Sequence, residues 1–342
     1  MHFDRGLSLR MVVLDTRSNL DHRDRECQDS SNPLNWSVQS TTTMSKSPDF
    51  IIIGAMKCAT STLHDQLAQQ PGIFMSELKE PNFFSNDDIY VQGWEWYASH
   101  FEDASPQDLC GESSTHYTKL PTYPDTVERI RQSLPEVKLI YVMRHPVERL
   151  VSQYIHEWSQ RVMSEEINTA VDQYPELIEY SRYTVQLQPF FDTFGPDRIL
   201  PVFFERLATD PQAELERIGR FIGYSGQPTW EDNRDAQNVS TARMRQSLLR
   251  DLIVEAPGLR ELRRLLIPKS FRLWVRSLWT MKDKPELASE KVERLEKIFD
   301  EDLKVLGSWL GMSLSCENFK ETVCANSVNW REDAGKILRP LS

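Results

Sequence analysis

The sequence predicts an α/β fold with a central parallel sheet flanked by helices. Three short apolar runs carry this prediction, because each has the composition of a buried strand and each is followed by a segment with helical spacing. The runs span residues 50–53, 138–143 and 198–204. Strands that alternate with helices indicate crossover connections, which join parallel strands. We therefore expect a three-layer fold of P-loop-like topology, with helices on both faces of the sheet.

The predicted strands lead into helices through polar connections. The stretch 54–62 follows the first strand, and Leu63 and Leu67 then lie one helical turn apart. After the second strand, Pro146 suits the first turn of a helix. A last amphipathic helix is expected over about 289–306. These elements give the alternation that a parallel sheet requires.

The composition is that of an ordinary soluble globular protein. Of the 342 residues, 39% are apolar and 27% are charged, which argues against disordered, collagenous and disulfide-scaffold classes. The 40 Lys and Arg residues against 51 Asp and Glu residues give a net charge of −11. A dedicated nucleic-acid binder needs a basic excess to neutralise phosphates, so no nucleic-acid partner is expected. The apolar runs fall far short of the roughly 18 residues of a membrane span, so no transmembrane segment is expected.

The cysteines show no CxxC spacing, which disfavours both a zinc site and a closed disulfide framework. They are Cys27, Cys58, Cys110, Cys316 and Cys324. An odd set without such spacing favours a reducing compartment, so we expect a cytoplasmic protein. No metal site is predicted, and the oligomeric state stays open.

Length alone allows two domains or one large α/β domain. Residues 1–47 combine six basic and six acidic residues without an apolar period, which disfavours a targeting peptide and predicts a flexible N-terminal extension. Between residues 243 and 284, 11 basic residues stand against four acidic ones, a local charge of +7. This basic stretch could be a solvated helix surface, a contact to anionic lipid or a lid over a bound nucleotide.

The most informative segment is IIIGAMKCATSTL, residues 51–63. A strand that ends in a loop of small residues, with hydroxyls where the next helix begins, offers backbone N–H groups and a helix N-terminus to a phosphate. Lys57 adds a mobile positive charge. The segment therefore predicts an anion-binding loop.

This loop departs from the Walker A pattern of ATPases, in which lysine directly follows the second glycine. Lys57 lies only three residues after Gly54, and its neighbour is Cys58 instead of a hydroxyl residue. A nucleotide kinase also needs Mg²⁺, usually supported by an acid at the end of a second strand. The second predicted strand ends in Arg144 instead. Both features favour an anionic cofactor that protein charges bind without a metal.

At this point the sequence resembles the sulfotransferases that use 3′-phosphoadenosine 5′-phosphosulfate, PAPS. GAMKCATSTL looks like the loop that binds the 5′-phosphosulfate in that family, and Arg144 with Ser152 looks like the element that binds the 3′-phosphate. The resemblance is closest to the branch of the heparan sulfate sulfotransferase domains and bacterial small-molecule sulfotransferases. It is carried there by LKEPNFF at 78–84, GWEWYASHF at 93–101 and GESSTHY at 111–117, and covers roughly residues 49–312.

The resemblance implies a domain organisation and a set of site residues. It implies a sulfotransferase domain over 48–312, followed by a C-terminal extension over 313–342. It implies that Lys57 stabilises charge on the leaving oxygen and that Glu80 is the general base, with His116 as the second candidate. The implied cofactor-binding residues are Lys57, Cys58, Ala59, Thr60, Ser61, Thr62, Arg144, Ser152, Tyr183 and Arg243.

Each of these residues also has a simpler structural interpretation. Arg144 could form a salt bridge with Glu148, and Ser152 could be an ordinary hydroxyl on a helix surface. Glu80 could be a surface charge, and His116 could be structural or line the acceptor pocket. Cys58 could be a small buried residue.

The expected function is transfer of a sulfuryl group from PAPS to a hydroxyl or amine of a small-molecule acceptor, without a metal ion. An oligosaccharide or glycosaminoglycan acceptor is the first alternative, because the basic stretch 243–284 could line a cleft. A P-loop small-molecule kinase and a catalytically inactive nucleotide-binding module are the others.

Overall fold

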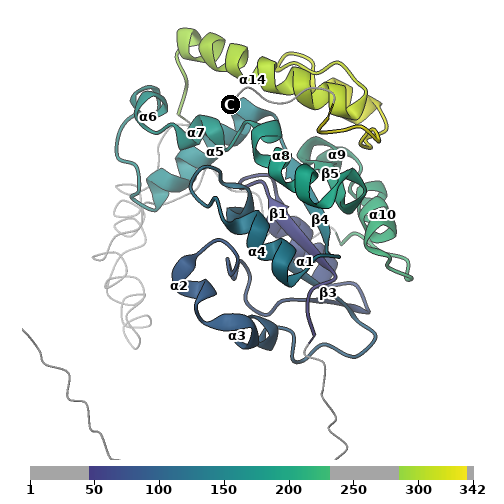
Figure 1. Ribbon diagram of the computed structural model, residues 1–342. Helices are drawn as coiled ribbons and strands as arrows, with labels where there is room; N and C mark the ends of the chain where they lie inside the picture. The colour runs from purple at the N-terminus through teal and green to yellow at the C-terminus, as the bar shows by residue number, and fades with distance from the viewer. Residues whose placement is uncertain (1–45, 232–284, 337–342) are drawn as a thin grey trace, which may run out of the picture. The chain divides into compact units, whose positions relative to one another are not determined.

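The computed structural model describes residues 46–231 and 285–336, and its centre is a parallel sheet (Figure 1). Within the described residues the sheet has five strands in the order β2-β3-β1-β4-β5. They are β1 (Phe50–Gly54), β2 (Ile73–Met75), β3 (Leu109–Ser113), β4 (Lys138–Met143) and β5 (Ile199–Phe203). The predicted α/β class with a central parallel sheet is confirmed.

Helices occupy the connections between the strands and the C-terminal part of the described chain. They are α1 (Thr60–Ala68), α2 (Asp87–Tyr90), α3 (Gly93–Ser99), η1 (Thr115–Thr118), α4 (Thr126–Ser133), α5 (Pro146–Ser159), α6 (Ile167–Gln173), α7 (Glu176–Glu179), α8 (Tyr183–Phe194), η2 (Pro196–Arg198), α9 (Phe204–Thr209), α10 (Pro211–Ile222), α14 (Ser289–Leu310) and α15 (Phe319–Ala325). The predicted last amphipathic helix is confirmed as α14, which ends where Gly311 takes a left-handed conformation with φ 72°.

The strand order reverses at β1. The chain places β2 and β3 on one side of β1 and then β4 and β5 on the other side. Phe50 of β1 is therefore in register with Gly111 of β3 and with Lys138 of β4. In open parallel sheets, ligands bind outside the carboxyl ends of the strands at such a reversal. The loop after β1 lies at this edge.

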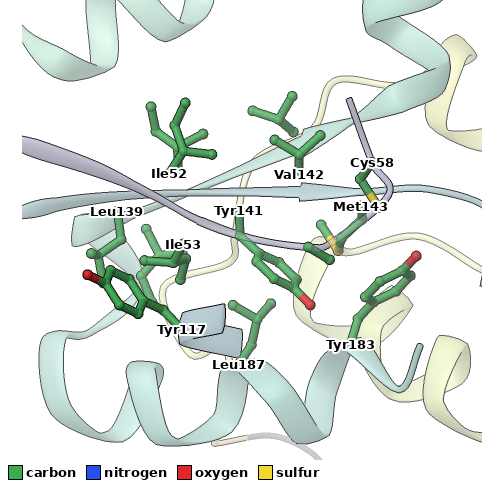
Figure 2. Close-up of a cluster of buried hydrophobic side chains, with 14 of the residues drawn as sticks. Ile52, Ile53, Cys58, Tyr117, Leu139, Tyr141, Val142, Met143, Tyr183 and Leu187 are labelled. Carbon is green, nitrogen blue, oxygen red and sulfur yellow. The ribbon is translucent and has the colours of Figure 1, made fainter. Parts of the chain in front are cut away.

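Both faces of the sheet are buried. Ile52 and Ile53 are fully shielded from solvent, although neighbouring residues on a strand point to opposite faces. Figure 2 shows Ile53 and Tyr141 on one face, together with Tyr117 of η1 and Leu187 of α8. Apolar strands that are covered on both sides are typical of parallel sheets, which explains why these strands have continuous apolar runs in the sequence.

Helix α14 lies beside α8 and α5 (Figure 1). Its Asp302 is buried and accepts hydrogen bonds from the backbone N–H of Thr184, at 3.2 Å, and from the Thr184 hydroxyl. Burial raises the pKa of Asp302 to about 6. Because these bonds satisfy donors in the first turn of α8, α14 fixes the start of that helix.

Residues after α14 contact the segment that follows β4. Nε2 of His145 lies 3.0 Å from the backbone oxygen of Cys316, and its ring packs edge-on against Phe319. Lys320 forms an ion pair with Glu148 of α5. Residues 313–336 thus support the second predicted ligand-binding element. The boundaries 1–47, 48–312 and 313–342 stay predictions.

Two features of the sequence lie outside the described residues. They are the predicted N-terminal extension, except for residues 46 and 47, and the basic stretch 243–284 with Arg243.

We expect that replacing Gly54 with alanine lowers the free energy of unfolding by roughly 3 kcal/mol. Gly54 has φ +149°, and a Cβ built on it would overlap with Oγ1 of Thr118, so the substitution adds both backbone strain and a clash. Gly72→Ala is the matched control, because Gly72 has φ +83° with no atom of the described residues within 4 Å of its Cβ direction, and it should cost about 1 kcal/mol. Urea denaturation measures the free energy of unfolding of both variants. An equal loss in Gly54→Ala and Gly72→Ala would show that Thr118 does not constrain Gly54.

Candidate functional site

The loop between β1 and α1 has the geometry of an anion-binding loop. The backbone N–H of Ala55 donates to the carbonyl of Val142 in β4 at 2.8 Å, which ties the loop to the neighbouring strand. Lys57 and Ala59 both have left-handed conformations, with φ 72° and 66°. Helix α1 then begins at Thr60, and no side chain caps it. Backbone N–H groups at such a helix start are available to an anionic group.

The residues of this loop differ in how they can reach a ligand. Ser61 is exposed, and Lys57, Ala59 and Thr62 are partly exposed. Cys58 is completely buried, and its backbone N–H donates to the carbonyl of Ala55 at 3.2 Å. Burial raises the pKa of its thiol to about 12. Cys58 is thus a small, neutral, buried residue here, as in the structural interpretation of the sequence.

Arg144 follows β4, at the same edge of the sheet as the loop after β1. Its Nη2 lies 3.1 Å from Oε2 of Glu148, and its guanidinium lies over the ring of Phe204, 4.5 Å from the centroid. Burial opposes ionisation of Glu148, but Lys320 and Arg144 outweigh it and lower its pKa. Ser152 lies one turn beyond Glu148 on α5 and is partly exposed. The salt bridge foreseen as an alternative is present.

Tyr183, at the start of α8, holds the main chain of Arg144. The backbone N–H of Arg144 donates to the Tyr183 hydroxyl at 3.1 Å, and that hydroxyl donates to the Arg144 carbonyl. The ring is fully buried. Asp302 of α14 in turn fixes the first turn of α8. Tyr183 therefore holds the main chain of Arg144, and its expected role in cofactor binding stays a prediction.

Glu80 lies in the segment between β2 and α2, close to the end of β3. Its backbone N–H donates to the carbonyl of Ser113 at 3.0 Å, and its Oε1 lies 3.4 Å from the hydroxyl of Thr115. Glu80 and Asn82 have positive φ angles of 56° and 52°. Such conformations persist only where the surroundings determine them, and they cluster at functional sites.

A buried carboxylate in β3 supports this segment. Glu112 accepts hydrogen bonds from the hydroxyls of Tyr97 and Ser114, the latter at 2.5 Å. The hydroxyl of Ser114 accepts one from the backbone N–H of Asn82 at 3.0 Å. Burial raises the pKa of Glu112. A chain of bonds thus runs from the aromatic cluster of α3 through Glu112 to the segment that carries Glu80.

His116 lies in η1, which packs against the end of β1. The Thr118 hydroxyl fixes η1 there by donating to the carbonyl of Ile53 at 2.9 Å. The His116 ring stacks on Tyr123, with centroids 5.0 Å apart. Burial, together with the charge of Lys119, lowers the pKa of His116 to about 4, so the imidazole is neutral at pH 7. Helix η1 therefore lies, with His116 on it and Glu80 beside its Thr115, at the edge of the sheet where the loop 54–62 lies.

Lys119 is a residue of this edge that the sequence analysis missed. Its side chain is largely buried, with Nζ 5.8 Å from the ring centroid of Tyr180. Burial lowers the pKa of Lys119 to about 8, although Glu157 and Glu80 act in the opposite direction. Gln186 fixes the next residue by bonding both main-chain groups of Leu120, at 2.7 and 3.0 Å.

Arg149 is the second missed residue. It lies on the inner face of α5, it is fully buried, and its Nη1 lies 3.4 Å from the carbonyl of Met56 in the loop 54–62. One signal was present in the sequence: Arg149 and Gln153 lie four residues apart and directly precede Leu150 and Tyr154 of the apolar stripe. Polar residues on the buried side of a helix indicate a specific interaction.

The structure thus gathers most of the predicted residues at the carboxyl edge of β1, β3 and β4. Arg243 lies outside the described residues. Within the described ranges, no group of three or more His, Cys, Asp or Glu side chains is arranged to hold a metal ion. None of the helices described there is long and apolar enough to cross a membrane.

Comparison with known proteins gives matches to sulfotransferases. The profile described as "Sulfotransferase family" matches residues 94–232, which include Arg144, Ser152 and Tyr183 but not the loop 54–62. A solved structure of a sulfotransferase from Alicyclobacillus acidocaldarius overlaps with 66% of this chain and 99% of its own, with a TM-score of 0.49 and 24% identity.

Curated relatives match at higher identity. The chain is 40% identical over 110 residues to the membrane-associated sulfotransferase kil1 of Dictyostelium discoideum, covering 31% of this chain and 22% of that protein. It is 33% identical over 210 residues to the heparan sulfate glucosamine 3-O-sulfotransferase 3B1 of Mus musculus, covering 58% of this chain and 51% of that protein. The chain thus spans about half the length, or less, of these relatives. The chain is thus similar to sulfotransferases over the parts that these matches cover.

Proposed function

We propose that this chain transfers a sulfuryl group from PAPS to a hydroxyl or amine of an acceptor, without a metal ion. One observation carries the proposal: the loop around Lys57 and the residue Arg144 follow adjacent strands, β1 and β4, at the reversal point of the sheet. Two cationic elements at one edge suit a nucleotide that is anionic at both its 5′ and its 3′ position. The family match supports the sulfuryl group as the group transferred.

The proposed binding roles follow from the position of each residue. The N-terminus of α1 and the N–H groups of the loop bind the 5′-phosphosulfate, and Lys57 neutralises charge that develops on the bridging oxygen. Arg144 and Ser152 bind the 3′-phosphate. For this the Arg144 guanidinium exchanges part of its contact with Glu148 for the ligand, while Tyr183 keeps its main chain in place.

Glu80 is the proposed general base. The acceptor oxygen or nitrogen attacks sulfur, the bond from sulfur to the bridging oxygen breaks, and the acceptor proton passes to Glu80, leaving 3′-phosphoadenosine 5′-phosphate. Thr115 and the strained backbone of Glu80 fix the direction of the carboxylate. His116 remains the second candidate, but burial removes the near-neutral pKa that makes histidine an effective base.

The acceptor class is the open part of the proposal. Relatives named as heparan sulfate glucosamine 3-O-sulfotransferases favour a glucosamine-containing oligosaccharide, which the sequence analysis held as the alternative. A small-molecule acceptor is the second class to test. A cytoplasmic location also stays a prediction.

The proposed roles of Lys57 and Glu80 can be separated by mutation. Lys57→Ala should weaken binding of 3′-phosphoadenosine 5′-phosphate and lower kcat/KM by roughly 100-fold, because it removes charge from both the ground state and the transition state. Glu80→Gln should leave nucleotide affinity within about threefold but lower kcat by roughly 100-fold or more, since the proton acceptor is lost. Calorimetry measures binding, and mass spectrometry of the sulfated acceptor measures turnover.

Exposed residues of the same types provide the controls. Lys304→Ala on α14 and Glu77→Gln near Glu80 should leave both quantities unchanged. Full activity of Glu80→Gln would reject Glu80 as the base and move the role to His116. Binding of ATP·Mg²⁺ with no affinity for 3′-phosphoadenosine 5′-phosphate would reject the proposed function in favour of a kinase.

Lys119 predicts a pH dependence if its cation contributes to the site. A lysine with a pKa of about 8 carries its charge below that pH and loses it above. We therefore expect kcat/KM for a hydroxyl acceptor to fall above about pH 8. Lys119→Met should lower the rate at pH 7 by roughly tenfold and remove this fall, while Lys119→Arg should keep the rate at high pH. A fall above pH 8 that persists in Lys119→Met would show that another group titrates.

A further inference from the structure

Arg149 is a fully buried cation, and its hydrogen-bond partners within the described residues are neutral. Its Nε donates to the hydroxyl of Ser181 at 2.6 Å, and its Nη2 donates to Oε1 of Gln153 at 2.8 Å and to the carbonyl of Leu177 at 3.0 Å. Among the described residues, no carboxylate lies within ion-pair distance of its guanidinium. A buried charge without a counter-charge is costly, and native proteins pair or ligate such groups.

The titratable groups around Arg149 do not supply a negative charge. They are Cys58, Tyr141, Tyr180 and Tyr183, and burial raises the pKa of each of them. All four are therefore neutral at pH 7. Arginine stays protonated in proteins, so the positive charge beneath the loop is not neutralised by these groups.

Arg149 also determines how one peptide of the loop is oriented. Its Nη1 and the Cys58 thiol both lie near the carbonyl of Met56, at 3.4 and 3.9 Å, on the buried side of the loop. In a trans peptide the carbonyl and the following N–H point in opposite directions. Holding the Met56 carbonyl inward thus directs the N–H of Lys57 away from Arg149, toward the outer side of the loop.

We propose that Arg149 is a positioning residue and fixed counter-charge for the 5′-terminal anionic group bound by the loop 54–62. This inference rests on the proposed function, in which that group is the 5′-phosphosulfate or the 5′-phosphate of the product. Arg149 acts from behind the loop, through the Met56–Lys57 peptide and through its charge. It does not touch the ligand, because its side chain is fully buried. Lys57 and Arg149 then attract the anion from opposite sides.

A comparison of two nucleotides isolates the 5′ group. 3′-phosphoadenosine 5′-phosphate and adenosine 3′-phosphate differ only in the 5′-phosphate. The Kd of adenosine 3′-phosphate divided by the Kd of 3′-phosphoadenosine 5′-phosphate therefore measures how much that group contributes to affinity. A structural defect weakens both ligands and leaves the ratio unchanged. Arg149→Met, which keeps much of the side-chain volume without the charge, should reduce the ratio by roughly 30-fold. Arg149→Lys, which keeps the charge, should reduce it by no more than about fivefold.

Arg217→Met is the matched control, because Arg217 is also mostly shielded but is paired with Glu214 far along the chain from the loop. It should lower the melting temperature without changing the ratio. If Arg149→Met does not fold, as judged by circular dichroism, Arg149→Gln replaces it with the same expected reduction. A wild-type ratio that persists in the folded charge-free variant would overturn the role of Arg149 alone. Failure of the wild-type chain to bind 3′-phosphoadenosine 5′-phosphate would instead overturn the proposed function.

Discussion

The geometry of the site depends on one close contact, the packing of Thr118 against Gly54. The Thr118 hydroxyl occupies the space of a Cβ at position 54 and donates to the neighbouring carbonyl of Ile53. This contact decides where the chain leaves β1, and with it the start of the phosphate loop. It also fixes η1, from which Thr115 reaches Glu80 and on which His116 lies. The proposed PAPS-binding loop and the proposed general bases Glu80 and His116 are therefore both positioned by the contact at Gly54.

The distribution of charge makes the proposed binding of a highly anionic nucleotide compatible with an acidic protein. The net charge of −11 is a sum over the chain, but the carboxyl edge of the sheet gathers the cations Lys57, Lys119, Arg144 and Arg149. Two of them are fully or largely buried, where water screens them less than at the surface. A local field of this kind depends on position and burial more than on net charge.

The sequence was sufficient for β1, β4 and β5, because continuous apolar strands have strong local signals. The loop of small residues after β1 was also apparent, and its role in binding phosphate stays a prediction. It was not sufficient for β2, whose three residues are too few for a periodic pattern. Lys119 was missed because its burial arises from contacts that are distant in the sequence. Its side chain packs on Tyr180, and Gln186 bonds the main chain of the next residue, Leu120. The bond between the Tyr183 hydroxyl and the main chain of Arg144 was not foreseen, because it depends on how α8 meets β4, which no local pattern records. The expected role of Tyr183 in cofactor binding stays a prediction.

A crystal structure with bound 3′-phosphoadenosine 5′-phosphate tests the central claim most directly. The account predicts the 5′-phosphate on the backbone N–H groups at the start of α1 with Lys57 beside it, and the 3′-phosphate on Arg144 and Ser152. Arg149 should remain buried, with its bond to the Met56 carbonyl intact. A nucleotide bound away from the loop, or bound there with its 3′-phosphate far from Arg144, would contradict the account.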